Sequence, residues 1–220
     1  TREELRLVKK SYYKSALLFN MKDHLSIFIF IMVLFIMGII FGAIIVNSLS
    51  LTQKEDLFYY LSQFFGELKQ GKISASSEMF LYSFKENAKF IILMWILGVS
   101  IIGLPLILIL LFVKGIVIGF TVGFLVSQTG WQGFMLACVS VLPQNIILVP
   151  VTIMMASCAV IISIKMIKRQ FLKSSREKLR PYFLQYSLML GVALLSFVVA
   201  SLLEAFLSPG LMKAVIDNMS

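Results

Sequence analysis

The sequence predicts an all-α, polytopic membrane protein, built as a helical bundle with five transmembrane helices. The first observation is composition: 59% of the 220 residues are hydrophobic, 14% are charged, and the mean hydropathy is +0.93. Soluble domains carry roughly 25% charged residues, so this chain cannot cover a soluble surface. The second observation is a series of apolar runs, each long enough to cross the hydrocarbon core. The third is the uneven distribution of basic residues, which predicts orientation.

The chain begins with a basic segment, residues 1–24, in which hydrophobic residues recur along one side of a predicted helix. Such a segment is typical of an interfacial helix on the cytoplasmic leaflet. The single transmembrane domain, residues 25–207, follows, and its first span is expected at 25–47. We expect an uncleaved anchor there, because the run is longer than a signal-peptide core and no small-residue cleavage site follows.

Residues 48–87 are slightly acidic and are expected to form an external helical hairpin. Thr52 and Glu55 have the spacing of a capping box. Hydrophobic residues then recur with helical spacing, and a second aromatic helix is expected from residue 78. The hairpin could pack on its own bundle, lie on lipid or dock another protein. The candidates for a partner interface are Tyr59, Tyr60, Phe64, Phe65 and Tyr82.

Two basic segments, 1–24 and 164–182, determine the predicted topology. The positive-inside rule places both in the cytoplasm, so an even number of spans must separate them. We therefore expect Lys114 at a cytoplasmic turn that divides the long run 88–126. The remaining spans are then expected at 88–112, 115–130, 133–163 and 183–207, with an external tail at 208–220. In an alternative reading, two half-helices replace the single span 133–163.

Glycines at four-residue spacing predict close helix packing. Without a side chain, two helix backbones can approach each other and gain dispersion contacts, either within one chain or between two copies in a homodimer. The residues with this spacing are Gly38, Gly42, Gly115, Gly119 and Gly123.

The stretch VLPQNIILVP, residues 141–150, places two prolines and two amides in an apolar run. Pro143 and Pro150 each free a carbonyl one turn earlier, and Gln144 and Asn145 are suitable donors to such groups. Transporters build binding sites from broken helices of this kind, but a packing kink has the same signature. The residues alone favour the kink.

The residue inventory predicts no enzyme, no cofactor and no metal site. The only histidine is His24, and Cys138 and Cys158 are about 30 Å apart if one helix holds both. We expect Lys114 to reach the cytoplasmic headgroups and Glu204 to lie near the outer end of the last helix, which weakens the case for a transport path. The basic charge faces anionic lipid in this topology, so no nucleic-acid partner is expected.

Four blocks in order resemble the stage II sporulation protein M family of endospore-forming bacteria. They are FIMGIIFGAIIVNSLS (35–50), QKEDLFYYLSQFFG (53–66), MWILGVSIIGLPLILILLFVKGIVIGFTVGFLV (94–126) and VSVLPQNIILVP (139–150). The similarity is dense from about residue 25 to 172. A wider superfamily carries a Pro-His-Gly stretch and an acidic residue before the second proline; here those positions are Gln144, Asn145 and Leu148. That departure weakens any inference of ion-linked chemistry.

The resemblance implies a multi-pass protein of the mother-cell septal and engulfing membrane. It also implies a non-catalytic scaffold that recruits and localises two peptidoglycan hydrolases, stage II sporulation proteins D and P, for septal wall thinning and forespore engulfment. From the residues, a small transporter or channel that uses the Pro143–Pro150 helix break is the alternative.

Overall fold

The computed structural model describes residues 24–69, 77–100, 102–172 and 180–217. Every regular element in these ranges is helical. The predicted helix at 1–24, the hairpin tip and the middle of the basic loop lie outside the described residues. The helices are α2 (Leu25–Ser48), α3 (Leu51–Lys69), α4 (Ser77–Gly98), α5 (Gly103–Ser140), α6 (Leu142–Leu172), α7 (Arg180–Leu202), the π-helical turn η1 (Leu203–Leu207) and α8 (Ser208–Asp217).

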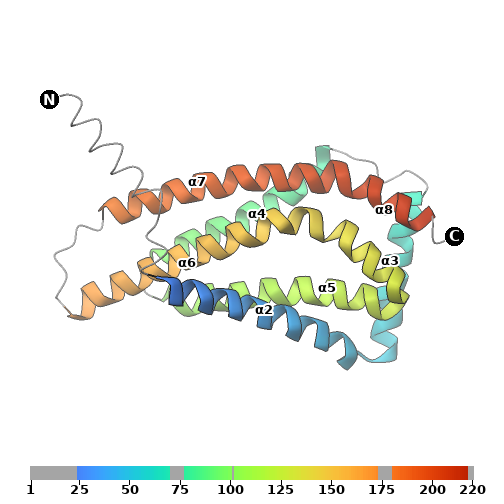
Figure 1. The fold of residues 1–220 in the computed structure, drawn as a ribbon, viewed down its shortest axis with the longest axis horizontal. Helices are drawn as coiled ribbons and strands as arrows, with labels where there is room; N and C mark the ends of the chain where they lie inside the picture. Colours follow the sequence, from blue (N-terminus) through green and yellow to red (C-terminus); the bar gives the residue numbers. More distant parts are fainter. Residues whose placement is uncertain (1–23, 70–76, 101, 173–179, 218–220) are drawn as a thin grey trace.

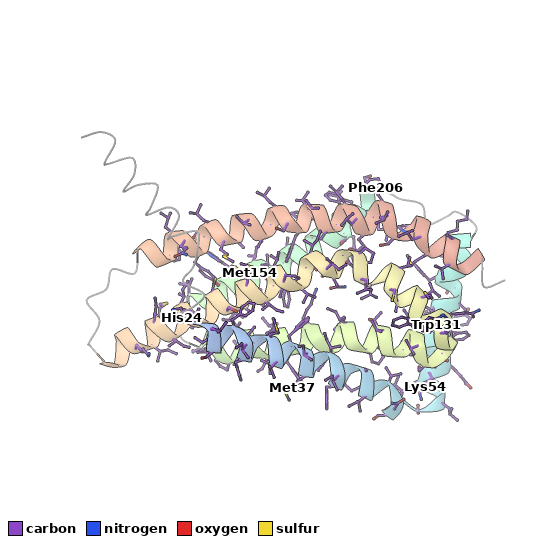
Figure 2. The ribbon with its side chains drawn as sticks, viewed as in Figure 1. His24, Met37, Lys54, Trp131, Met154 and Phe206 are labelled. Carbon is purple, nitrogen blue, oxygen red and sulfur yellow. The ribbon has the colours of Figure 1, made fainter. Side chains whose placement is uncertain are left out.

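Helices α2, α4, α5, α6 and α7 run along the bundle, and α3 crosses one of its ends (Figure 1). The starts of α2, α5 and α7 and the ends of α4 and α6 share the opposite end (Figure 1). Figure 2 shows His24 at that end and Lys54 and Trp131 at the end with α3. The direction of the chain therefore alternates between α4, α5, α6 and α7, whereas α2 runs parallel to α5.

Four stretches are long and apolar enough to cross a membrane: Leu25–Ser48, Gly103–Ser140, Leu142–Lys168 and Phe183–Val215. Helix α4 is not among them, because Lys85, Glu86 and Lys89 lie near its middle. The multi-pass helical bundle is thus present, while five spans, the orientation and the external tail stay predictions.

Helix α6 is the central helix of the bundle. Two thirds of its most apolar stretch is buried (67%), against 22–28% for the other three candidate spans. It packs on α2, α4, α5 and α7, and the main hydrophobic core includes Ile91, Met94, Leu111, Met155 and Phe197. The hydrophobic side chains on the outer faces, such as Met37 and Phe206, point away from the bundle (Figure 2).

The expected turn at Lys114 is wrong. Helix α5 continues through this residue, and the chain instead reverses at residues 99–102, between Gly98 and Gly103. Consequently the predicted spans 88–112 and 115–130 do not exist as separate helices. Residues 88–98 end α4, and 103–129 form one straight arm of α5. Lys114 is accommodated inside the helix because neighbouring helices supply partners for its ammonium group.

Gly130 reverses the chain at the end where α3 lies. Its backbone has φ 58° and ψ −129°, a conformation that residues with a Cβ rarely adopt. After this reversal the chain returns through 131–140, and α6 begins at Leu142 after the single residue Val141, whose backbone is right-handed helical. Helix α6 runs through both Pro143 and Pro150, so the chain is not broken into two half-helices at these prolines. The reading of 133–163 as one kinked span stays a prediction.

The first turn of α3 is capped, but by residues other than those expected. The Ser50 backbone N–H donates to Gln53 Oε1 at 3.0 Å, and the Gln53 backbone N–H donates to Ser50 Oγ at 3.3 Å. This reciprocal pair is a capping box. Thr52 and Glu55 lie inside the helix, so the predicted pair was displaced by two residues.

Candidate functional site

A polar cluster lies inside the bundle between α4, α5 and the end of α7. Lys114 Nζ of α5 donates to Asn87 Oδ1 of α4 at 3.1 Å, and Asn87 Nδ2 donates to the Ser83 carbonyl oxygen at 3.0 Å. Ser83 Oγ lies within hydrogen-bond distance of Ser201 Oγ at 3.3 Å and also contacts the Glu204 carboxylate. Three helical segments that are distant in sequence thus share one hydrogen-bonded chain.

Lys114 occupies the middle of a membrane-length helix. It lies eleven residues after Gly103, which corresponds to about 16 Å along the helix axis and about half of the hydrocarbon thickness. Its ammonium nitrogen also lies 5.2 Å from the centre of the Phe90 ring, a cation–π distance. An amide and an aromatic face therefore replace the water that this charge would otherwise require.

Glu204 belongs to η1, the π-helical turn that joins α7 to α8. Turns of this type widen the helix by one residue and frequently occur at functional sites. The carboxylate is close enough to Lys114 for Coulombic attraction, but no salt bridge joins the two groups in the described part of the chain. The cluster therefore holds two opposite charges apart, linked through Asn87 and Ser83.

Sequence reasoning missed this cluster, because it assigned Lys114 to a turn and Glu204 to a helix end. The available signal was the presence of these ionisable residues, with Asn87, inside or beside long apolar runs. Such residues face the bundle interior and mark functional sites by default. What the sequence could not show was that α4 brings Asn87 and Ser83 between them.

The predicted packing glycines face one another across α2 and α5. A Cβ added at Gly119 would lie 1.9 Å from the Ile39 carbonyl oxygen, and one added at Gly42 would lie 2.2 Å from that of Ile116. Gly38 and Gly115 approach each other in the same way, and Gly123 packs on Ala43. These glycines therefore pack against each other within one chain and are not free to pack against a second copy. The homodimer stays a prediction that these glycines do not support.

The residues of the proline stretch lie at the start of α6. Pro143 and Gln144 are the second and third residues of α6, and Pro150 lies inside the helix. Asn145 Nδ2 donates to the Val141 carbonyl oxygen at 2.7 Å, and the same oxygen accepts the Asn145 backbone N–H at 3.4 Å. A cavity of about 640 Å³ lies beside Asn145 and Pro150, and its other walls are hydrophobic side chains of α2, α5 and residues 134–142.

The structure separates the aromatic candidates of the predicted hairpin. Tyr59, Tyr60 and Tyr82 are 66%, 68% and 72% exposed, and the first two rings meet edge to face at 5.9 Å. Phe64 instead packs inward against the small hydrophobic cluster of Leu136 and Met212. The side chain of Phe65 lies outside the described residues.

No group of three or more histidine, cysteine or acidic residues with metal-binding geometry occurs in the described ranges. Cys138 and Cys158 are free thiols. The fold and the internal charges define a polytopic α-helical membrane protein with a polar cluster in its interior.

The chain belongs to the family described as stage II sporulation protein M, whose sequence profile matches residues 31–209, most of the chain. It is therefore a sporulation-related multi-pass membrane protein, of a family not known as enzymes. Neither a curated protein nor a solved structure matches the chain.

Proposed function

We propose that the protein is a non-catalytic membrane scaffold that recruits and localises the peptidoglycan hydrolases stage II sporulation proteins D and P during engulfment. Membership of the sporulation family supports this role. The single structural observation that carries the proposal is the exposure of three tyrosines, Tyr59 and Tyr60 on α3 and Tyr82 on α4, which together we call the tyrosine surface. Tyrosine gives large, amphipathic contact area and is enriched in protein interfaces.

The tyrosine surface belongs to the two elements that are best placed to meet an external partner. Helix α3 crosses the end of the bundle, and Tyr82 lies near the start of α4 (Figure 1). In the proposed topology this end lies on the outer side of the membrane, which is the side on which wall hydrolases act. The mother-cell septal and engulfing membrane is the proposed location.

Co-purification tests the scaffold directly. The chain and each hydrolase are co-expressed and solubilised together, and the hydrolase retained is compared for Tyr59→Ala, Tyr60→Ala and Tyr82→Ala variants. Loss of an aromatic anchor at the centre of an interface typically costs about 2 kcal/mol, or roughly 30-fold in affinity. Leu195→Ala is the matched control, since Leu195 is 70% exposed on the flank of α7.

The scaffold proposal fails if all three tyrosine variants retain both hydrolases and support engulfment as the unchanged protein does. Equal losses with Leu195→Ala would assign the effect to general folding rather than to the tyrosine surface. Circular dichroism of each purified variant keeps these outcomes distinct.

A small transporter or channel at the Pro143–Pro150 stretch is the second candidate, and the cavity beside Asn145 favours it. The walls of that cavity offer an ion few ligands, and the Asn145 amide already donates to Val141. An apolar solute fits this chemistry better than an ion does. Solute flux in reconstituted vesicles that is abolished by Asn145→Leu would support this candidate over the scaffold.

A further inference from the structure

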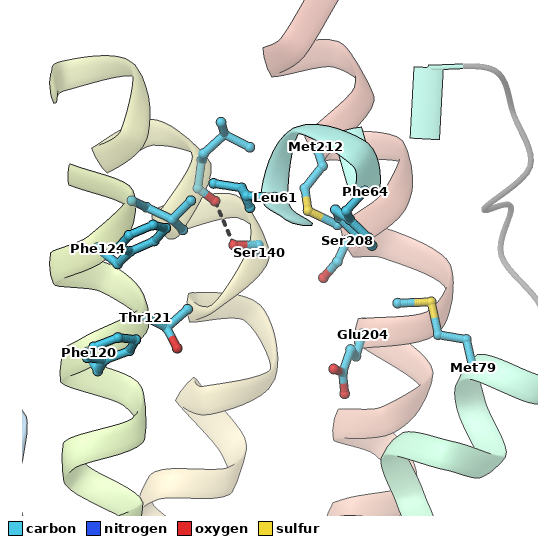
Figure 3. Close-up of a pocket in the computed structure, with 12 residues that line it drawn as sticks. Leu61, Phe64, Met79, Phe120, Thr121, Phe124, Ser140, Glu204, Ser208 and Met212 are labelled. Atoms are coloured by element: carbon cyan, nitrogen blue, oxygen red, sulfur yellow. Dashed lines mark hydrogen bonds between the residues drawn. The ribbon is translucent and has the colours of Figure 1, made fainter. Parts of the chain in front are cut away.

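A second cavity, of about 310 Å³, lies at the end of the bundle where α3 crosses it. Its walls come from α3, α4, the arm of α5 before Gly130, the returning segment 131–140, η1 and α8. Most of the lining is hydrophobic, including Leu61, Phe124 and Met212. Figure 3 shows Glu204 and Ser208 on one wall, with their oxygen atoms directed into the space, and Thr121 on the opposite wall.

Ser208 has a hydroxyl group that nothing satisfies in the described part of the chain. The residue is 1% exposed, and its Oγ has no hydrogen-bond partner there. The other two hydroxyls that line the cavity behave differently. Thr121 Oγ1 donates to the Val117 carbonyl and Ser140 Oγ to the Leu136 carbonyl, both at ordinary distances of 2.9 and 2.8 Å. A buried hydroxyl without a partner is energetically unfavourable, and a bound polar group would relieve this cost.

Glu204 contributes a carboxylate on the same wall, one helical turn before Ser208. Ser83 contacts its Oε2 atom, and none of the hydrogen bonds among the described residues uses Oε1. Lys114, the nearby cation of the bundle, is held by Asn87 instead of forming a salt bridge. The Glu204 carboxylate is partly buried, so a cation in direct contact would stabilise its charge.

We propose that this cavity binds a primary ammonium group attached to a short apolar body. The ammonium would donate to Glu204 and to Ser208 Oγ, and Thr121 Oγ1 has lone pairs on the facing wall. The aromatic and aliphatic side chains would contact the apolar body. A small metal ion fits less well, since hydrophobic groups form most of the lining. This proposal is independent of the scaffold role, because it concerns a different surface.

Two sources could supply this chemistry: a phosphatidylethanolamine headgroup or a free amine. The full chain is placed in phosphatidylcholine nanodiscs and titrated with n-hexylamine, while thermal unfolding reports binding. In a second arm, phosphatidylethanolamine replaces part of the phosphatidylcholine. Competition between this lipid and hexylamine identifies a lipid source, and saturable binding of hexylamine without such competition identifies a free amine.

Variants assign the binding to the cavity. We expect Glu204→Gln to weaken hexylamine binding at least about tenfold, and Ser208→Ala to weaken it several-fold with a smaller effect on the fold. Lys114→Met should strengthen binding, because it removes a like charge near the ligand. Glu55→Gln, at an exposed carboxylate of α3, is the matched control and should change nothing.

Three results would overturn the proposal. Binding of n-hexanol as strong as that of hexylamine would show an apolar cavity with no use for the carboxylate. Hexylamine binding unchanged in both Glu204→Gln and Ser208→Ala, or no saturable effect of either amine, would also reject it. If Glu204→Gln does not fold, Ser208→Ala decides the question.

Discussion

Replacing Gly119 by alanine should separate α2 from α5 and destabilise the bundle. The added Cβ would lie 1.9 Å from the Ile39 carbonyl oxygen, whereas nonbonded carbon and oxygen atoms need about 3.3 Å. The two backbones must therefore move apart by roughly 1.4 Å, the difference between these distances. A gap of that size removes a large part of the dispersion contacts along the seam.

The expected magnitude combines two opposing effects. Overpacking of a close contact costs about 1–3 kcal/mol, and here the obstruction is backbone rather than a flexible side chain. Alanine returns about 1 kcal/mol through its higher helix propensity. A net loss of up to about 2 kcal/mol follows, which is roughly a 30-fold change in the equilibrium between folded and unfolded protein.

Gly191→Ala provides the matched control for this experiment. Gly191 lies in α7, is exposed, and a Cβ there meets no atom within 4 Å in the described chain. The propensity effect then acts alone, so this variant should gain up to about 1 kcal/mol. Reversible unfolding in mixed micelles, followed by circular dichroism, measures both variants. If Gly119→Ala proves as stable as Gly191→Ala, α2 and α5 do not pack through this seam.

Three further predictions concern the interior and the topology. Asn87→Leu should destabilise the protein by about 1–3 kcal/mol, because it leaves the Lys114 ammonium without its amide partner. Adding Lys114→Met to this variant should restore most of the lost stability in the same unfolding assay. Equal stability of the single and double variants would contradict the coupling between Asn87 and Lys114. Tyr186→Phe should lower the free energy of unfolding by about 1 kcal/mol, since the buried Tyr186 hydroxyl donates to the Met94 and Trp95 carbonyls at 3.2 Å each. Unchanged stability would show that these hydrogen bonds make no net contribution to folding. In a chain without its native cysteines, a cysteine at Ser100 should react with a membrane-impermeant maleimide from the cytoplasmic side and one at Trp131 from the other side. Labelling of both from one side would remove α5 from the set of crossings.

The sequence predicted the elements whose boundaries coincide with a change of polarity. The first span was expected at 25–47 and is found at Leu25–Ser48, because a histidine and a serine-containing turn flank a uniform apolar run. The turn near residue 131 was also close, since Gly130 supplies the conformation that a tight reversal needs. In both cases the local chemistry alone determines where the helix begins or ends.

The turn at 99–102 could not be predicted in the same way. It contains no charge and no proline, and its one polar side chain is that of Ser100, so the run stays apolar through it. The prediction placed the turn at Lys114, because a lysine that faces lipid is expected to reach the headgroups. Its true place depends on Asn87, which arrives from another helix through tertiary packing. The same dependence on α4 concealed the contact between Ser83 and Glu204.

The parallel packing of α2 on α5 has a consequence for how the chain assembles during synthesis. The two halves of the glycine seam are separated by all of α3 and α4, so α2 enters the membrane long before its partner exists. Until then the small residues of α2 face lipid or the insertion machinery, where they gain little contact. Final docking must therefore follow translation of α5, and a nascent chain arrested before Gly103 would hold α2 with its seam face uncovered.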